Sequence, residues 1–195
     1  MMSALVLVLG LLLALQSTVI TPTTGGAIDD ETRNQLQQQA NDILVITANN
    51  GTQDLSWYVR YWNPDTRTFY GAKRPSIGYG AEGPPGTFGD ILKEAFTDQG
   101  RQYNLLVRYR GNTSPNSSGI QRIVYQGSPA EHAVVATYTI TLFDDNTLTG
   151  PKATSRELHQ YDTNASDNDD GYYPIPNIAP GKPVYNIVEV RLVVW

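Results

Sequence analysis

The sequence predicts an α+β fold, in which a long N-terminal hydrophobic helix (the stalk) precedes a head of short helices packed on a largely antiparallel β-sheet. Three observations indicate this. Residues 1–20 are almost entirely apolar, later stretches repeat apolar residues at helical spacing, and from residue 103 the pattern alternates every two residues. We therefore divide the chain into a stalk (1–20), a hinge (21–26) and an extracellular head (27–195).

The predicted stalk reads MMSALVLVLGLLLALQSTVI and contains no charged side chain. As a helix it would span about 30 Å, the thickness of the hydrocarbon core of a bilayer. Burying its side chains is worth on the order of 20–40 kcal/mol, so we expect it to lie in lipid or against copies of itself. A cleaved secretory signal is the alternative, but no basic residue precedes Arg33 and residues 17–22 form a poor cleavage site.

Small residues recur along this apolar segment. Small side chains allow apolar helices to approach one another closely, so we expect helix–helix packing along the face that bears them. The candidate assembly residues are Ser3, Gly10, Ala14 and Ser17.

A cluster of helix breakers follows the stalk, with Pro22, Gly25 and Gly26 as the candidate hinge residues. Beyond it a second helix is predicted to end near residues 49–51. Its apolar face would consist of Leu36, Ala40, Ile43, Leu44 and Thr47.

Two further helices are predicted in the head. Asp54 can cap a short helix that carries Leu55, Tyr58, Val59 and Trp62 on one side. The helical pattern is clearest from Thr87, the predicted cap, to Gly100, the predicted stop.

Strands are predicted where apolar residues alternate with polar ones. Turn-rich loops join these segments, which favours antiparallel pairing, and the last strand would place Trp195 in the sheet. The four segments are 103–110, 120–126, 132–143 and 184–195.

Composition excludes several kinds of chemistry. The chain has no cysteine, which rules out disulfides, thiolate metal sites and a cysteine nucleophile. A net charge of −5 argues against nucleic acid as a partner. The charged residues comprise 13 Asp, 6 Glu, 10 Arg and only 4 Lys, which favours adaptation to high salt over an ordinary acidic extracellular domain.

Few residues suggest catalysis or cofactor binding, and we predict a protein that is not an enzyme and has no cofactor. The GxGxxG match at 78–83 lacks the flanking strand and helix of a nucleotide site, so it is interpreted as a loop. His132 and His159 could in principle join a serine and an aspartate in a catalytic triad, but no serine of the chain lies in a nucleophile-elbow motif. The oxygen-rich loop Asp162–Asp170 does not fit an EF-hand; we interpret it as solvated, with calcium binding as the weaker alternative.

Four N-x-[ST] sequons occur in predicted turns or loops, where a glycosyltransferase could reach them. The candidate N-glycosylation sites are Asn50, Asn112, Asn116 and Asn164.

In its order of parts the chain resembles the archaeal, particularly haloarchaeal, type IV pilin-like proteins. The resemblance rests on the hydrophobic stretch that ends at residues 14–22, the Gln-rich helix, the Tyr61-Trp62-Asn63-Pro64 turn and the 88–100 helix before a β-rich end. It implies insertion in the membrane, trimming by a prepilin peptidase, and assembly with the N-terminal helices as the filament core. The chain departs from the pattern, because it shows no peptidase site and no glutamate among its first five residues.

Together these expectations describe a structural subunit of an archaeal type IV pilus-like filament at the cell surface, assembled through its N-terminal hydrophobic helix. Its expected partners are copies of itself or other pilin-like subunits, membrane lipid before assembly, and N-linked glycans. The alternatives are a monomeric membrane-anchored adhesin or glycan-binding module, which would use Trp57, Tyr61 and Trp62, and a membrane-tethered hydrolase.

Overall fold

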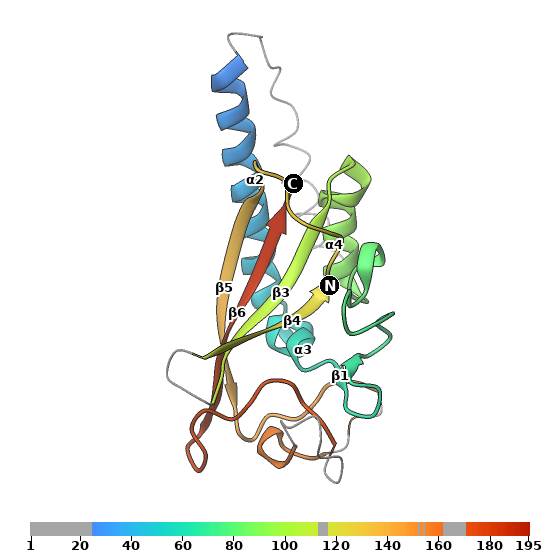
Figure 1. Cartoon of the computed structure of the whole chain (residues 1–195), viewed down its shortest axis with the longest axis vertical. Coiled ribbons are helices and arrows are strands. Elements are labelled where there is room, and N and C mark those ends of the chain that lie inside the picture. The colour runs from blue at the N-terminus through green and yellow to red at the C-terminus, as the bar shows by residue number, and fades with distance from the viewer. Residues whose placement is uncertain (1–24, 113–116, 152, 154, 162–170) are drawn as a thin grey trace. The chain divides into compact units, whose positions relative to one another are not determined.

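The structure, a computed structural model, describes residues 25–112, 117–151, 153, 155–161 and 171–195. The chain divides into two compact units, Met1–Asn34 and Gln35–Trp195. The described residues form an α+β arrangement with antiparallel sheets, and every described strand belongs to the second unit (Figure 1). Four short 3₁₀ helices complete the described elements: η1 (Gly51–Gln53), η2 (Gly80–Glu82), η3 (Thr97–Gln99) and η4 (Leu158–Gln160).

The predicted fold class is wrong in its first part, the hydrophobic stalk. Among the described residues the longest helix is α2 (Gly25–Ala48), which begins after the apolar segment and whose sequence contains five charged residues. Within the described residues, no helix combines the length and the apolar character needed to cross a membrane. The prediction of a separate stalk helix over residues 1–20 rested on apolar composition alone. Residues 1–20, and with them Ser3, Gly10, Ala14 and Ser17, lie outside the described residues.

The predicted hinge falls partly on α2. Gly25 and Gly26 are the first two residues of this helix, and Pro22 lies outside the described residues. Glycine is unfavourable in the interior of a helix but is tolerated in the first turn. The two glycines that predicted a hinge therefore lie at the start of a helix instead.

The second half of α2 packs on the large sheet through the face that the sequence predicts. Burial of each large aliphatic side chain contributes about 1.5–3 kcal/mol. The Thr47 hydroxyl donates to the Ile43 carbonyl at 2.8 Å, so its burial leaves no unpaired oxygen. The helix ends at Ala48, as expected. The buried residues of this face are Leu36, Ala40, Ile43, Leu44 and Thr47.

The short helix α3 (Leu55–Val59) is capped by Asp54, whose carboxylate accepts a hydrogen bond from Trp57 N at 2.7 Å. The helix stops at Val59, so Trp62 is not on its last turn as predicted. Trp62 instead opens a two-stranded hairpin of β1 (Trp62–Asn63) and β2 (Thr68–Phe69).

The GxGxxG stretch at 78–83 forms a loop that includes the single-turn helix η2. The backbone at its first glycine, Gly78, requires a residue without a side chain. Gly78 has φ +59°, and a Cβ there would lie 2.0 Å from the Ile123 carbonyl oxygen. The loop is held to the end of a neighbouring strand by the hydrogen bond from Tyr79 N to Ile123 O. Helix α4 (Thr87–Ala95) follows, with Gly86 rather than Thr87 at its N-cap.

The four-stranded sheet has the order β4-β3-β6-β5, and all its pairs are antiparallel. The strands are β3 (Tyr103–Arg110), β4 (Ser118–Val124), β5 (Val134–Phe143) and β6 (Val184–Val194). The strand nearest the C-terminus is therefore central. Trp195 extends the pairing beyond it, since its backbone exchanges two hydrogen bonds of 3.0 Å with Gln102.

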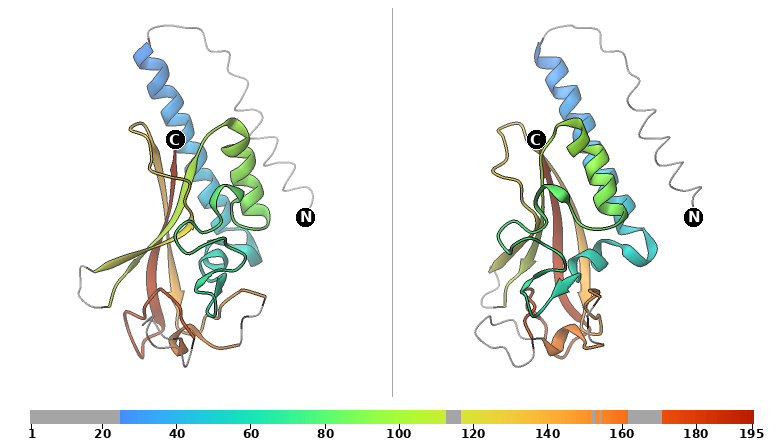
Figure 2. Two further views of the ribbon diagram at one scale, coloured as in Figure 1. Left: turned by 45° about the vertical axis from the view of Figure 1, so that its right-hand side comes forward. Right: turned by 90° about the vertical axis from the view of Figure 1, so that its right-hand side faces the viewer.

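Helices cover one face of this sheet. Figure 2 shows α4 and the second half of α2 on the same side of the strands. Most of the side chains that point to this side are almost fully buried; they include Tyr103, Leu105, Val107, Ala136, Val188, Val190 and Leu192. The opposite face, called the outer face below, has no helix over it among the described elements.

Candidate functional site: the outer face of the sheet

The outer face displays the alternate residues of all four strands. The registers place Ile120, Arg108, Glu189 and Thr139 in one row across the sheet. Because side chains alternate between the two sides of a strand, the neighbouring residues at i±2 share this face. It therefore also carries Val135, Thr137, Thr141, Phe143, Ile187, Arg191, Arg110, Ser118 and Arg122.

Large apolar side chains are exposed on this face. The exposed fractions are 59% for Ile120, 43% for Val135, 44% for Phe143 and 41% for Ile187. Single exposed aliphatic residues are ordinary on protein surfaces. Four of the six large exposed hydrophobic residues of the described structure share this one face, however, and such clustering is typical of contact surfaces.

The outer face is basic in a chain that is acidic overall. Four arginines lie on it against a single glutamate, and Arg191 binds that glutamate, Glu189, at 2.9 Å. Arg122 turns to one side, where its guanidinium donates to Ser76 O at 3.1 Å and lies 4.5 Å from the centre of the Tyr125 ring. Within the described residues, Arg108 and Arg110 are exposed and have no ion pair or side-chain hydrogen bond.

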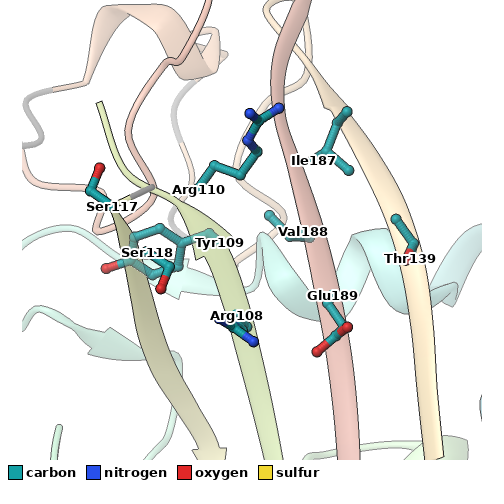
Figure 3. Close-up of a pocket in the computed structure, with 9 residues that line it drawn as sticks. All are labelled: Arg108, Tyr109, Arg110, Ser117, Ser118, Thr139, Ile187, Val188 and Glu189. Carbon is teal, nitrogen blue, oxygen red and sulfur yellow. The ribbon is translucent and has the colours of Figure 1, made fainter. Parts of the chain in front are cut away.

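A shallow, open hollow of about 320 Å³ lies around these two arginines. In Figure 3 the Arg110 side chain extends from β3 toward Ile187 on β6, while Arg108 and Glu189 lie further along the same two strands. Cationic, hydroxyl and apolar groups therefore meet in one depression. Its lining residues are Arg108, Tyr109, Arg110, Ser117, Ser118, Thr139, Ile187, Val188 and Glu189.

A buried asparagine holds the strand end that carries Arg110. Asn186 is fully buried on β6, and its Nδ2 donates to Arg110 O at 3.0 Å and to Pro176 O at 2.7 Å. Its Oδ1 accepts from Arg110 N at 3.4 Å. The side-chain amide thus extends the hydrogen bonding between β3 and β6 by one residue. It also fixes the backbone of Arg110, from which the guanidinium group projects.

Tyr109 lies on the same strand as Arg110, and its side chain points to the face of the sheet that the helices cover. Burial raises the pKa of its phenol, and the nearby Tyr172 phenol raises it further. Its ring lies across Gly119 of β4, where a Cβ would come within 2.3 Å of the ring. Gly119 therefore allows the close approach of β3 and β4 beside the hollow.

The aromatic residues that the sequence offers for glycan contact are not equivalent. Trp62 is only 2% exposed, and its Nε1 donates to Tyr172 O at 2.8 Å, so its place is in the core. Trp57 and Tyr61 are half-buried and stack on each other, with ring centroids 4.4 Å apart. Trp62 is therefore not available to a glycan in this structure.

The two histidines do not meet. His132 precedes β5, and His159 contacts Asp144, which follows the other end of that strand, so about 30 Å of strand lies between them. His159 Nδ1 lies 3.3 Å from a Glu157 carboxylate oxygen. The described residues contain no group of three potential metal ligands, and the candidate calcium loop Asp162–Asp170 lies outside them.

Two of the four candidate glycosylation sites can be located. Asn50 is exposed in the turn after α2, and Asn112 is exposed after β3. Asn116 and Asn164 lie outside the described residues.

Comparison with protein families gives one result. Residues 1–194 match the model of a family of unknown function, DUF7288, so the chain belongs to that family. Searches of curated proteins and of solved structures found no significant match.

The sequence gives only part of this site. The alternation of apolar and polar residues in 103–110 predicts that Arg108 and Arg110 lie on the side of the strand away from the core. The structure places both side chains there. The hollow could not be found in this way, because it depends on pairing with β6, a strand about eighty residues away.

Proposed function

We propose that the protein is a structural subunit of a type IV pilus-like surface filament, in which copies of the chain contact one another through the outer face of the sheet. The observation that carries the proposal is this face itself. Interfaces are enriched in arginine and large apolar residues and depleted in lysine. The outer face has four arginines, four exposed large apolar residues and no lysine.

The amino-acid sequence adds a second support. Residues 1–20 are apolar and uncharged, and they precede a polar chain of ordinary composition. Exposure of so much apolar surface to water is unfavourable. Association of this segment with copies of itself in a filament, or with lipid before assembly, removes it from water. In this proposal the head lies outside the cell, where Asn50 and Asn112 are open to glycosylation.

The test is electron microscopy of surface material from cells that produce the chain, combined with mass spectrometry of the subunit's N-terminus. Regular fibres whose subunits retain the apolar segment are expected. Dispersed single molecules, or a mature chain that begins beyond Pro22, would contradict the proposal.

Substitution on the outer face sharpens this test. Ile187→Asp places a charge among the exposed apolar residues without touching the core, since Ile187 is 41% exposed. We expect it to abolish fibres while the circular dichroism spectrum of the chain is unchanged. Ile187→Val is the matched control, because it keeps an apolar β-branched side chain at the same point, and it should leave fibres intact.

The glycan-binding alternative retains one favourable observation, the half-buried Trp57–Tyr61 stack. Replacement of Trp57 by alanine separates the two proposals, because it should reduce binding to a glycan array only if the alternative holds.

A further inference from the structure

We propose that the hollow around Arg108 and Arg110 binds the acidic segment 162–170 of a neighbouring copy of the chain. This inference rests on the proposed function, since it names one of the contacts that would join subunits. It would also explain why an acidic protein keeps two arginines exposed side by side on a sheet face that no described helix covers.

The binding side of the contact is defined by two arginine side chains that have no partner among the described residues. Arg108 and Arg110 occur on one strand, two residues apart, so both guanidinium groups project from the same face. Their neighbour Glu189 is already bound by Arg191, through Nε at 3.2 Å and Nη2 at 2.9 Å. The charge of Glu189 is thus neutralised by Arg191, and Arg108 and Arg110 can bind carboxylates from another chain. Guanidinium groups recognise carboxylates well.

The occupant is indicated by charge. Residues 162–170 read DTNASDNDD, with four aspartates and no lysine or arginine. No other stretch of nine residues in the chain has as many acids without a base. The short polar side chains between the aspartates also suit the hydroxyl groups of Ser118 and Thr139 that line the hollow.

The residues that flank this segment favour a contact between copies over a contact within one copy. Gly171 lies beside Pro64 and Tyr161, and the next residue, Tyr172, accepts the hydrogen bond of the buried Trp62 indole. These neighbours pack with the core on the covered side of the sheet. Arg108 and Arg110 project from the opposite side, so a second copy can present its acidic segment to them directly.

The closing experiment uses the absence of cysteine from the chain. Two full-length single-cysteine variants are prepared and dispersed in detergent: Ser118→Cys on the outer face and Asn168→Cys in the acidic segment. They are mixed and treated with a short thiol cross-linker. Because each variant has one thiol, a heterodimer can form only between copies. Lys182→Cys, at an exposed loop position, replaces Ser118→Cys in the control mixture.

We expect about tenfold more heterodimer from the Ser118→Cys and Asn168→Cys mixture than from the control, which corresponds to about 1.4 kcal/mol of preference. The yield should fall when salt is raised from about 0.1 M to about 1 M, where the screening length shrinks from ~10 Å to ~3 Å. Adding Arg108→Glu and Arg110→Glu to the Ser118→Cys chain should reduce the yield to the control level. Reversal of two charges elsewhere, Arg74→Glu with Lys182→Glu, should not.

Equal yields in the test and control mixtures, or a yield unaffected by Arg108→Glu and Arg110→Glu, would overturn the inference. Failure of the proposed function looks different. If the wild-type chain forms no fibres but the specific heterodimer is found, the contact stands and the filament proposal fails. If fibres form and the charge-reversed chain forms them equally well, the filament proposal stands and this contact is wrong.

Discussion

The side-chain amide of Gln37 pairs with the backbone of Val135 as a neighbouring strand would. Its Nε2 donates to Val135 O at 2.8 Å, and its Oε1 accepts from Val135 N at 3.3 Å. Val135 lies on β5, an edge strand of the sheet. One residue of α2 therefore closes part of an open edge, which would otherwise be free to pair with another chain.

Replacing Gln37 by alanine should lower the free energy of unfolding by about 1–2 kcal/mol, because two hydrogen bonds are lost at a partly exposed position. The measurement is urea unfolding of the full chain in detergent. Gln38→Ala is the matched control, since Gln38 lies one position away and is exposed, and its effect should be within ~0.5 kcal/mol. Equal effects of the two substitutions would show that the amide pairing contributes nothing.

Asn186 should be among the most sensitive polar positions of the head. Asn186→Leu keeps the size of the side chain but leaves Arg110 O, Pro176 O and Arg110 N without their partner. Unpaired buried backbone groups cost about 1–3 kcal/mol each, so we expect a loss of about 3 kcal/mol in urea unfolding.

The comparison variant for Asn186→Leu is Asn104→Leu. Asn104 is also buried, and it binds the backbone of Gln126 and Gly127. Both variants should lose stability, but only Asn186→Leu should also lower the cross-linking of Ser118→Cys to Asn168→Cys. Equal cross-linking in the two would argue against a positioning role for Asn186.

Gly78 should resist substitution far more than Gly51. Both have positive φ, +59° and +62°, so alanine at either position is strained by about 1–2 kcal/mol. At Gly51 a Cβ would meet nothing within 4 Å, whereas at Gly78 it would lie 2.0 Å from Ile123 O. Gly78→Ala should therefore destabilise the head by at least ~2 kcal/mol more than Gly51→Ala in thermal or urea unfolding. Similar losses would mean that the loop can move away from β4.

Stability should fall above pH 10 because of buried tyrosines. Burial raises the pKa of Tyr103 from 10.0 to about 12, and burial also raises the pKa values of Tyr79, Tyr173 and Tyr185. Below pH 10 these phenols are neutral in both states, so their contribution is fully present. Above pH 10 the unfolded chain loses protons first. Stability is then lost as the pH rises through the folded-state pKa, by about 3 kcal/mol between pH 10 and 12 for Tyr103 alone.

The alkaline transition can be followed by phenolate absorbance together with circular dichroism. Tyr103→Phe should reduce the dependence of stability on pH above 10. If all twelve tyrosines form phenolate near pH 10 without any loss of structure, the buried tyrosines are not shielded as described.

Sequence periodicity predicts local elements well in this chain. The buried face of α2 from Leu36 to Thr47 and the span of β3 agree with the structure, because a helix stripe and strand alternation are local consequences of burial. Trp62 was assigned to a helix and in fact starts a hairpin, since its partner Phe69 lies beyond a turn that periodicity does not describe.

The relationships that are distant in the chain were not predictable. The pairing of Gln37 with Val135 joins residues 98 positions apart, and the polar run that contains Gln37 looks like an ordinary solvated face. The central position of β6 likewise depends on pairing with strands from two different parts of the chain. The stalk prediction used apolar composition alone, which indicates a need for burial but does not determine where a helix begins.

Hydroxyl-radical footprinting of the dispersed and assembled chain tests the central claim most directly, since it reports which side chains become covered when copies associate. Ile120, Phe143 and Ile187 on the outer face should be protected in the assembled chain, while Val45 and Ile46, exposed on α2, serve as internal references. Unchanged labelling of the three outer-face residues in assembled material would contradict the account.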